Sequence, residues 1–451
     1  MRRAGIYATL LLTGFIAAFI YLGYTLVTES PSYMSRSGAA SYGVVYDRSG
    51  DVLFDGTKKL SEYPKGQFAD VGNVIGDTSG QMANTLVARN LTELANYSFL
   101  YGTGSGKASL KTTLSHTANK AVYNAFGKKN GTAIAYNWKT GEVYVCVSKP
   151  SVDPAQGYAN IDKLAEGSLL CKAFLPTVPG STQKVSTLIA AYETLGEETV
   201  NSLEYSCTGA WNNASGQRIN CHENKGHGKQ TLYKAFANSC NPYFAQLVQS
   251  EKLPLSKIIE TYTRMGYSVN GAAASELSLN GIRIAAASTT LKDAKDFDTQ
   301  WGCLGQGTTL VSPFQLMLWE GAIANQSGTA VLPTMLMEKT DVSGASSLIA
   351  RPGSTGMLFT ADAAKATYAC MTDNAAKNYG TLKNYHCGVK SGTAQITDGS
   401  KEYENSLLAG FCTDDKCPVA FCVMIEQYKK GDVTTAQIVK TMLDKIAAAI
   451  K

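Results

Sequence analysis

Apolar residues follow three patterns along the chain, and each pattern predicts a different kind of element. Residues 5–27 carry no charge, and a helix of that length rises about 34 Å, enough to cross a hydrocarbon core of roughly 30 Å. Apolar residues at helical spacing predict helices over residues 82–94, 114–126 and 434–450. Alternating apolar residues around turn sequences predict β-hairpins over residues 41–56 and 131–147.

The order of these elements predicts how they assemble. Helical segments broken by Gly/Asn loops dominate residues 171–356, and β-rich runs return at residues 388–396, 407–412 and 419–426. Strands, then a helical block, then strands and a last helix predict an α/β (α+β) domain whose sheet is built from both ends of the domain. The helical block is then an insertion between the two groups of strands.

The flanks of the apolar stretch predict its orientation. Arg2 and Arg3 precede it and Glu29 is the first charge after it, so the positive-inside rule places residues 1–4 in the cytoplasm and the chain after residue 30 outside. A cleaved signal peptide is the alternative, but its apolar core spans only about 7–15 residues. We expect a single-pass cell-membrane anchor over residues 5–27, followed by a Ser/Gly/Pro-rich linker over residues 28–40.

Composition narrows the classes of function. Hydrophobic residues make up 44% of the chain and charged residues 17%, which is the balance of a globular protein. A net charge of +5 without a long run of like charges argues against a nucleic-acid-binding protein. The eleven cysteines are an odd number, so at least one is free or pairs between chains.

The first segment with candidate chemistry is residues 179–193. Ser181 and Lys184 lie three residues apart at a predicted helix start, so both side chains face the same side of the first turn. A serine hydroxyl needs an adjacent base to act as a nucleophile, and a buried lysine with a lowered pKa can be that base. Ser-x-x-Lys is also a common helix cap with a solvated lysine, so the motif alone does not establish catalysis.

A second Pro-Gly-Ser-Thr tetrapeptide, residues 352–355, provides an internal comparison. It repeats residues 179–182, but Met357 stands where the lysine should be and no apolar helix begins there. This copy lacks a base and is predicted to be a loop. The lysine, rather than the tetrapeptide, therefore carries the chemical argument.

Two further polar segments follow in order. Ser239 and Asn241 lie in a short loop between two apolar helical runs, where both can face one cleft. Lys390 projects from a predicted strand, and Gly392 beside it allows close substrate approach. Each segment also has an ordinary explanation, a polar helix connection or a solvated lysine on an edge strand. Together the three match the ordered set Ser-x-x-Lys, Ser-x-Asn, Lys-(Ser/Thr)-Gly.

That ordered set resembles the penicillin-binding proteins and serine β-lactamases. The flanks at residues 41–54, 129–154, 171–184 and 305–328 resemble the monofunctional, class B-like D,D-transpeptidases. The resemblance implies a β-lactamase/transpeptidase-like fold, an antiparallel sheet flanked by helices with an inserted all-helical subdomain. It also implies a linker and small pedestal domain at residues 28–108 and a penicillin-binding transpeptidase domain at residues 109–451.

The resemblance implies a role for each residue of the motifs. Ser181 attacks the carbonyl of a D-alanyl-D-alanine stem peptide and forms an acyl-enzyme, and Lys184 accepts its proton. Ser239 and Lys390 relay the proton to the leaving D-alanine. Asn241 orients the substrate and Lys184.

The last motif is implied to bind the substrate through Ser391, Gly392 and Thr393. The backbone N–H groups of Ser181 and Thr393 form an oxyanion hole, and the Thr393 hydroxyl, with Lys390, holds the terminal carboxylate. The amine of a second stem peptide then resolves the ester and cross-links the wall. β-Lactams acylate Ser181 because they mimic the dipeptide.

Two features depart from the family pattern. Leu407 and Leu408 stand where an aromatic pair often follows the last motif, so substrate contacts made by that pair do not carry over. Residues 41–108 are short for the family's pedestal, so a large dimerisation or partner-binding platform does not carry over either.

Cysteines and histidines gather in residues 206–228. Cys207, Cys221, His222 and His227 are acceptable zinc ligands, but their spacing fits no standard finger. We expect instead a disulfide between Cys207 and Cys221, with reduced thiols as a further alternative. No metal and no cofactor enter the expected function.

Two smaller features have their own interpretations. Cys412 and Cys417 flank a turn sequence and either bridge across two strands or stay unpaired in the core. Residues 102–108 look like a phosphate-binding loop, but Tyr101 replaces its first glycine and Ala108 its Ser or Thr. We expect an interdomain hinge there.

The leading functional hypothesis is a peptidoglycan D,D-transpeptidase that binds stem peptides and β-lactams at the membrane, with a glycosyltransferase or a division or elongation protein as a candidate partner. A D,D-carboxypeptidase or an anchored β-lactamase shares the motifs but not the long flanks. An inactive wall-peptide scaffold or a β-lactam sensor is the non-enzyme alternative. The complete set of motif residues argues against the scaffold, and a four-residue tail argues against the sensor.

Overall fold

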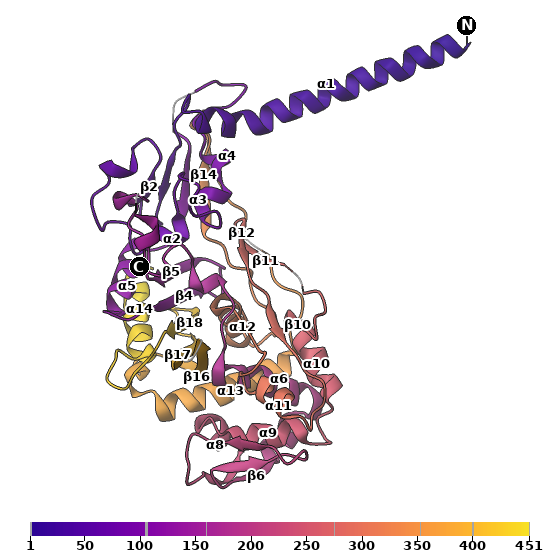
Figure 1. Cartoon of the computed structure of the whole chain (residues 1–451), viewed down its shortest axis with the longest axis vertical. Coiled ribbons are helices and arrows are strands. Elements are labelled where there is room, and N and C mark those ends of the chain that lie inside the picture. The colour runs from indigo at the N-terminus through magenta and orange to yellow at the C-terminus, as the bar shows by residue number, and fades with distance from the viewer. Residues whose placement is uncertain are drawn as a thin grey trace.

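The computed structural model describes residues 2–103, 107–158, 160–274, 276–351, 353–398 and 401–450. These residues form an elongated body from one end of which a long helix projects (Figure 1). Residues 104–106 of the expected hinge and Pro352 of the second tetrapeptide lie outside the described residues.

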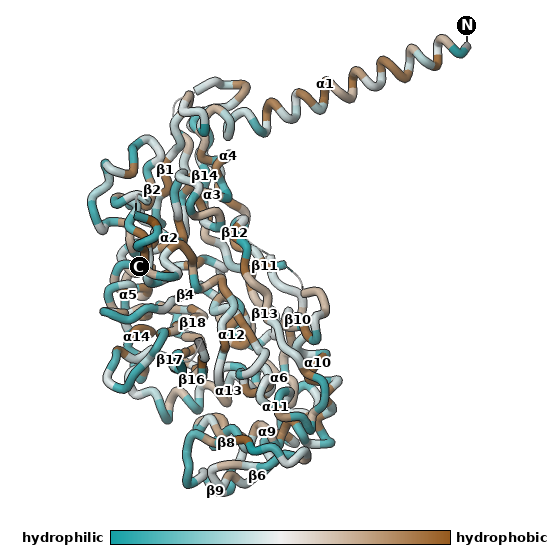
Figure 2. The backbone as a smooth tube through the Cα atoms, viewed as in Figure 1, coloured by the Kyte–Doolittle hydropathy of each residue, from teal (hydrophilic) through white to brown (hydrophobic). Residues whose placement is uncertain are grey.

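The projecting helix is α1 (Arg2–Arg36). Among the described residues it alone is long and apolar enough to cross a membrane, and its most apolar window is not buried against the protein. Apolar residues recur along its whole projecting length (Figure 2). The helix predicted for residues 5–27 is confirmed, but the linker predicted from residue 28 is wrong as far as residue 36. Pro31 lies inside the helix; a proline removes one hydrogen bond and need not end a helix.

The central sheet has the strand order β16-β17-β18-β4-β5, and every neighbouring pair is antiparallel. Its strands come from both ends of the domain, as predicted: β4 (Gly131–Asn137), β5 (Val143–Lys149), β16 (Cys387–Asp398), β17 (Lys401–Cys412) and β18 (Val419–Ile425). Strand β18 pairs with β4 along its whole length and so joins the two groups.

Both faces of this sheet are covered by helices, which confirms the predicted sheet flanked by helices. In β4, Ala133 and Ala135 face one core and Ile134 and Tyr136 the other, as strand alternation requires. Helices α5 (His116–Ala125) and α14 (Thr435–Ala449) cover the first face, and both begin at a capping side chain within the predicted ranges. Helices α12 (Pro313–Ala324) and α13 (Ala361–Asn378) lie in the second core.

A second sheet lies at the end of the body that carries α1 (Figure 1). Its order is β15-β14-β3-β1-β2. The predicted hairpin over residues 41–56 is confirmed by β1 (Val44–Tyr46) and β2 (Val52–Asp55). Strands β14 (Leu336–Thr340) and β15 (Ser346–Leu348) complete this sheet around β3 (Ser109–Thr112). The domain boundary expected between residues 108 and 109 therefore runs through this sheet.

The inserted block between the two groups of central strands is not all-helical, which corrects the prediction. Its α-helices are α6 (Lys184–Leu195), α7 (Glu197–Ser202), α8 (Leu232–Ala237), α9 (Asn241–Gln249), α10 (Leu255–Arg264), α11 (Phe297–Cys303), α12 and α13. It also holds short strands, β6 (Glu204–Cys207), β7 (Ala210–Asn212), β8 (Arg218–Asn220), β9 (Gly228–Thr231), β10 (Tyr267–Val269), β11 (Leu277–Leu279), β12 (Ile282–Ile284) and β13 (Ala287–Thr289). Strands of three or four residues are too short to show an alternating pattern.

The single helix predicted over residues 82–94 is also wrong. The chain there forms α3 (Leu86–Arg89) and α4 (Leu91–Leu94), which meet at Asn90. The Asn90 side chain donates to the Leu86 carbonyl at 2.8 Å. A local side-chain bond of this kind competes with the helical hydrogen bonds of the backbone.

Candidate active site

The turn that carries Ser181 is seated directly on β16. Residues Gly180–Gln183 form a 3₁₀ turn that leads into α6 at Lys184. Gly180 has φ +55°, and a Cβ atom there would lie 2.6 Å from the Thr393 carbonyl oxygen. A Cβ atom on Gly392 would lie 2.5 Å from the Pro179 carbonyl oxygen. Because only glycine fits both places, the first and last motifs can meet without a gap.

The middle motif lies in the connection between α8 and α9. Ser239 has φ +49°, a left-handed conformation that costs a non-glycine residue energy. Cys240 is the N-cap of α9, and Asn241 is its first residue. The kink at Ser239 turns both its carbonyl and its hydroxyl toward Lys184, at 2.7 and 3.3 Å from Nζ.

The Lys184 amine lies at hydrogen-bond distance from four oxygen atoms, two of which can only accept. Nζ donates to the Ser239 carbonyl at 2.7 Å and to Asn241 Oδ1 at 2.7 Å. A neutral amine has two N–H bonds and one lone pair, so these acceptors use both donors. Ser181 Oγ lies 2.9 Å from Nζ, at hydrogen-bond distance from the remaining lone pair. The arrangement can remove a proton from the serine hydroxyl.

A second buried lysine reaches the same group from β16. Lys390 Nζ donates to Ser239 Oγ at 3.0 Å and to the Ser391 carbonyl at 2.9 Å. The Ser239 hydroxyl therefore lies between two amines, 3.3 Å from that of Lys184. Asn374 of α13 holds this part of the strand by donating to the Val389 carbonyl at 2.8 Å.

Burial changes the charge states of both lysines. Desolvation, helped by the positive charge of Lys390, holds the pKa of Lys184 well below its usual range. Desolvation lowers the pKa of Lys390 to about 7, although the nearby Cys370 acts in the opposite direction. The shift at Lys184 therefore favours its neutral amine over the ammonium. That is the state a general base requires.

These groups open into a cleft of about 720 Å³. Ser181, Ser239, Asn241, Ser391 and Thr393 line it, so the structure brings all three predicted motifs to one place. Lys184 and Lys390 are buried behind the lining residues. Gly392 is buried where β16 meets the Ser181 turn. Leu407 and Leu408 are fully buried in β17 and line no part of this cleft.

Sequence reasoning assigned no role to four other residues of the cleft wall, Arg218, Trp301, Gln306 and Glu404. Gln306 Nε2 donates to the Thr393 carbonyl at 3.2 Å and so fixes the last motif. Gln306 lies in residues 305–328, one of the segments that resemble the family, so the sequence holds a signal for this residue. Arg218 and Trp301 lie outside any motif.

The comparison tetrapeptide behaves as predicted. Ser354 is exposed and makes an isolated bridge to Val331, without a helix after it. Met357 is 56% exposed, whereas Lys184, at the corresponding place after the first tetrapeptide, is 0% exposed. No base lies beside this serine among the described residues.

The disulfide expected between Cys207 and Cys221 is absent, because each of the eleven cysteines, all among the described residues, is free and buried. Cys412 and Cys417 stay unpaired in the core, the second of the two alternatives stated for them. Cys207 and Cys221 instead lie near His227 and Cys240. Cys412 is paired in register with Cys387 across β16 and β17 rather than with Cys417. Cys417 Sγ donates to the Leu443 carbonyl at 3.7 Å, inside the core.

Comparison with known proteins gives a consistent result. Residues 131–444 match the family model for the penicillin binding protein transpeptidase domain. Stage V sporulation protein D of Bacillus subtilis (strain 168) is 28% identical over 284 residues, which cover 62% of this chain and 42% of that protein. Peptidoglycan D,D-transpeptidase FtsI of Buchnera aphidicola is 27% identical over 353 residues, which cover 73% of this chain and 56% of that protein. The matches span about half the length of these two relatives.

Solved structures share the fold. The D,D-transpeptidase domain of a peptidoglycan glycosyltransferase from Eggerthella lenta has a TM-score of 0.74 at 19% identity, covering 90% of this chain and 99% of that one. PBPA from Mycobacterium tuberculosis has a TM-score of 0.72 at 17% identity, covering 91% of this chain and 99% of that one. At these identities the likeness concerns the arrangement of the chain.

Proposed function

Because this chain belongs to the penicillin-binding protein transpeptidase family, we propose that it is an acyltransferase of the cell wall, a serine D,D-transpeptidase that cross-links peptidoglycan stem peptides. The observation that carries this proposal is the Lys184 amine, whose two N–H bonds are used by Ser239 and Asn241 while Ser181 Oγ lies 2.9 Å away. A neutral, oriented base beside a serine is what nucleophilic catalysis needs.

These contacts support the following acylation step. Ser181 Oγ attacks the carbonyl of the penultimate D-alanine as Lys184 takes its proton. The backbone N–H groups of Ser181 and Thr393 stabilise the oxyanion. The proton moves through the Ser239 hydroxyl, which lies 3.0 Å from Lys390 Nζ, to the amine of the departing D-alanine. The C–N bond breaks, and the peptide remains as an ester on Ser181.

The substrate is held by the last motif and by Asn241. Ser391 and Thr393 line the cleft, and the Thr393 hydroxyl, with Lys390, binds the terminal carboxylate. In the second half-reaction the amine of another stem peptide attacks the ester, and the same proton path runs in reverse. β-Lactams stop the enzyme at the first half-reaction because their ring carbonyl acylates Ser181.

The site acts outside the cell in this proposal. Helix α1 anchors the chain as a single-pass protein, with residues 1–4 in the cytoplasm. The body after Arg36 then lies outside the membrane, on the side where wall peptides are assembled. Division or elongation proteins and a glycosyltransferase are the partners that such a placement offers.

Mass spectrometry of the full chain in detergent after exposure to benzylpenicillin tests the nucleophile. The wild type should gain one penicilloyl group, and Ser181→Ala should gain none. Ser354→Ala is the matched control, because it removes the serine of the repeated tetrapeptide and should leave the adduct unchanged. An adduct of equal yield on Ser181→Ala would refute the assignment.

The acceptor is tested separately with a stem pentapeptide ending in D-alanyl-D-alanine and a labelled D-amino acid. Incorporation of the label in exchange for the terminal D-alanine supports a transpeptidase. Release of D-alanine without incorporation would instead identify a carboxypeptidase. Rapid release of hydrolysed drug in the first experiment would identify a β-lactamase.

A further inference from the structure

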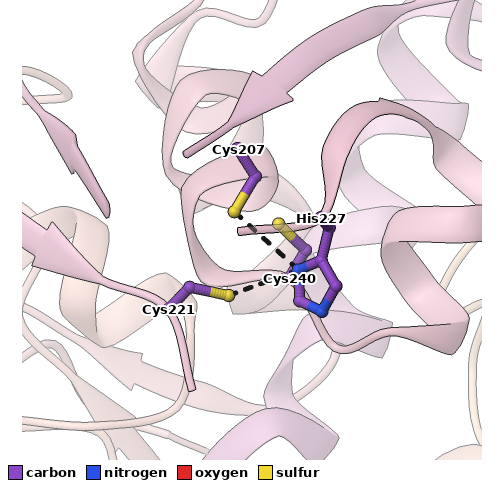
Figure 3. Close-up of side chains that lie close together, drawn as sticks. All are labelled: Cys207, Cys221, His227 and Cys240. Carbon is purple, nitrogen blue, oxygen red and sulfur yellow. Dashed lines mark hydrogen bonds between the residues drawn. The ribbon is translucent and has the colours of Figure 1, made fainter. Parts of the chain in front are cut away.

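Four side chains that can bind a metal converge behind the middle motif. Cys207, Cys221, Cys240 and His227 place their ligand atoms within 4.8 Å of one another. Figure 3 shows the three sulfur atoms and the imidazole turned toward a common centre. The cysteines are at most 5% exposed and His227 is half-buried. His222, the fourth ligand considered from the sequence, is not a member of this group.

The spacing matches a tetrahedral ion. Zinc–sulfur bonds of about 2.3 Å and zinc–nitrogen bonds of about 2.0 Å at tetrahedral angles put sulfur and nitrogen about 3.5 Å apart. The Nδ1 atom of His227 lies 3.4 Å from Cys221 Sγ and 3.8 Å from Cys207 Sγ. Only small side-chain movements would then be needed to surround the ion.

The fold brings the ligands together from distant parts of the insertion. Strands β6 and β9 pair so that Cys207 lies opposite Gly228, the residue after His227. The Cys221 N–H donates to the Gly209 carbonyl at 2.9 Å. Gly226 has φ +77°, and a Cβ atom there would lie 2.3 Å from the Cys207 carbonyl oxygen. This close crossing of the chain keeps the loop between β8 and β9 tight against Cys207.

The donor set selects the metal. Three thiolates and one imidazole in a tetrahedral, buried arrangement are the ligands of structural zinc sites. A disulfide between any two of the cysteines would involve neither the third thiol nor His227. A single ion uses all four groups.

We propose that this cluster is a structural Zn²⁺ site, formed by the thiolates of Cys207, Cys221 and Cys240 and by Nδ1 of His227. Binding releases the three thiol protons and leaves the neutral imidazole as the fourth ligand. The site does not depend on the reaction proposed above and would exist in an inactive chain as well.

The ion sits where it can hold the catalytic loop. Cys240 lies between Ser239 and Asn241, the two residues that accept both N–H bonds of Lys184. Asn241 Nδ2 also donates at 3.0 Å to the Asn220 carbonyl, next to Cys221. Cys221 and His222 line the cleft from the same loop. A bond from zinc to Cys240 therefore fixes the strained turn at Ser239 from behind.

Metal analysis of the full chain, purified in detergent with reductant, tests the site. Wild type should hold about one zinc per chain after gel filtration, and Cys207→Ser and His227→Ala should lose it. His222→Ala is the matched control and should keep the ion, because its ring neighbours His227 but lies outside the ligand group. Equal zinc in all four proteins, or none in the wild type after reconstitution with zinc chloride, would overturn the proposal.

Two measurements on the wild type cover the case in which a ligand variant fails to fold. Chelation followed by Co²⁺ should give a thiolate-to-cobalt charge-transfer band, and Cys207, Cys221 and Cys240 should be alkylated faster in the chelated chain than in the metal-loaded chain. No cobalt band in a chain whose thiols are reduced, or equal alkylation rates with and without metal, would contradict the site.

The positioning role has its own readout. Chelation should slow acylation by benzylpenicillin, and Zn²⁺ or Co²⁺, but not Mg²⁺, should restore it. If the chain binds zinc but is never acylated, the proposed function fails and the metal site stands. If acylation is unchanged in verified zinc-free chain, the ion does not position the loop.

Discussion

Lys390→Met tests the charge state of the site through protein stability. Lys390 is 1% exposed, and burial lowers its pKa from 10.5 to about 7. The unfolded chain therefore binds a proton more tightly than the folded chain does. Stability is highest above pH 10.5 and is lost progressively as the pH falls to about 7. Methionine has a similar length and no charge, so the substitution removes this pH-dependent loss of stability.

The size of the effect follows from the two pKa values. Each pKa unit is worth about 1.4 kcal/mol, so the buried lysine costs about 4 kcal/mol at pH 7 and about 2 kcal/mol at pH 9. Methionine also loses the hydrogen bonds to Ser239 and Ser391, worth about 1–2 kcal/mol each. The hydrogen-bond loss is nearly independent of pH. The difference in unfolding free energy between variant and wild type should therefore fall by about 2 kcal/mol from pH 7 to pH 9.

Urea unfolding of the full chain in detergent, followed by tryptophan fluorescence at both pH values, measures this difference. Lys377→Met, which replaces an exposed lysine of α13, controls for the general effect of the substitution. If the difference in unfolding free energy between Lys390→Met and wild type changes by less than about 0.5 kcal/mol between the two pH values, the lowered pKa of Lys390 is refuted.

Two other substitutions test single features of the structure. Gly180→Ala should slow benzylpenicillin acylation by about tenfold or more, because its Cβ would lie 2.6 Å from the Thr393 carbonyl. Gly353→Ala, at the same place in the repeated tetrapeptide and with nothing within 4 Å, should have no effect, and equal rates for both variants would contradict the seating of the turn. Glu320→Gln should raise the unfolding free energy at pH 8 but much less at pH 5. Burial raises the pKa of the Glu320 carboxyl well above 4.5, so ionisation of this group at higher pH favours the unfolded chain. Urea unfolding at both pH values checks this, and a difference that does not change with pH would contradict it.

The sequence predicted the elements whose patterns are local and long. Strand β4 alternates between two cores and α14 spans fifteen residues, so periodicity identifies both. Strands β6 to β13 of the inserted block have three or four residues and are defined by their partners, which periodicity cannot detect. The continuation of α1 through Pro31 was missed because Ser, Gly and Pro are enriched in linkers without being confined to them.

Candidate site residues divide in a similar way. Ser181, Lys184, Ser239, Asn241 and Lys390 lie in motifs of fixed spacing, and the structure brings them together. The roles assigned to them remain to be tested by the experiments above. Arg218 and Trp301 enter the cleft only through the folding of loops and have no local signature.

Cys240 has no local signature of a metal ligand for the same reason. Its partners lie 13 to 33 residues earlier in the chain, from His227 to Cys207. Only the pairing of β6 with β9 and the turn before α9 bring these groups together.

The site combines two arrangements that each cost folding energy. Two lysines are buried close enough for the charge of Lys390 to lower the pKa of Lys184, and Ser239 adopts a left-handed conformation. Unfavourable conformations of this kind persist only where contacts from the surrounding structure hold them in place. Glycines 180 and 392 fix the front of the site against β16, and Lys184 and Lys390 hold the loop of Ser239 and Asn241 from the cleft side. A metal ligated through the residue between Ser239 and Asn241 would add a constraint from behind, because it would tie that loop to β6 and to both ends of the β8–β9 connection. The direction of the Lys184 lone pair would then depend partly on an ion outside the reacting groups.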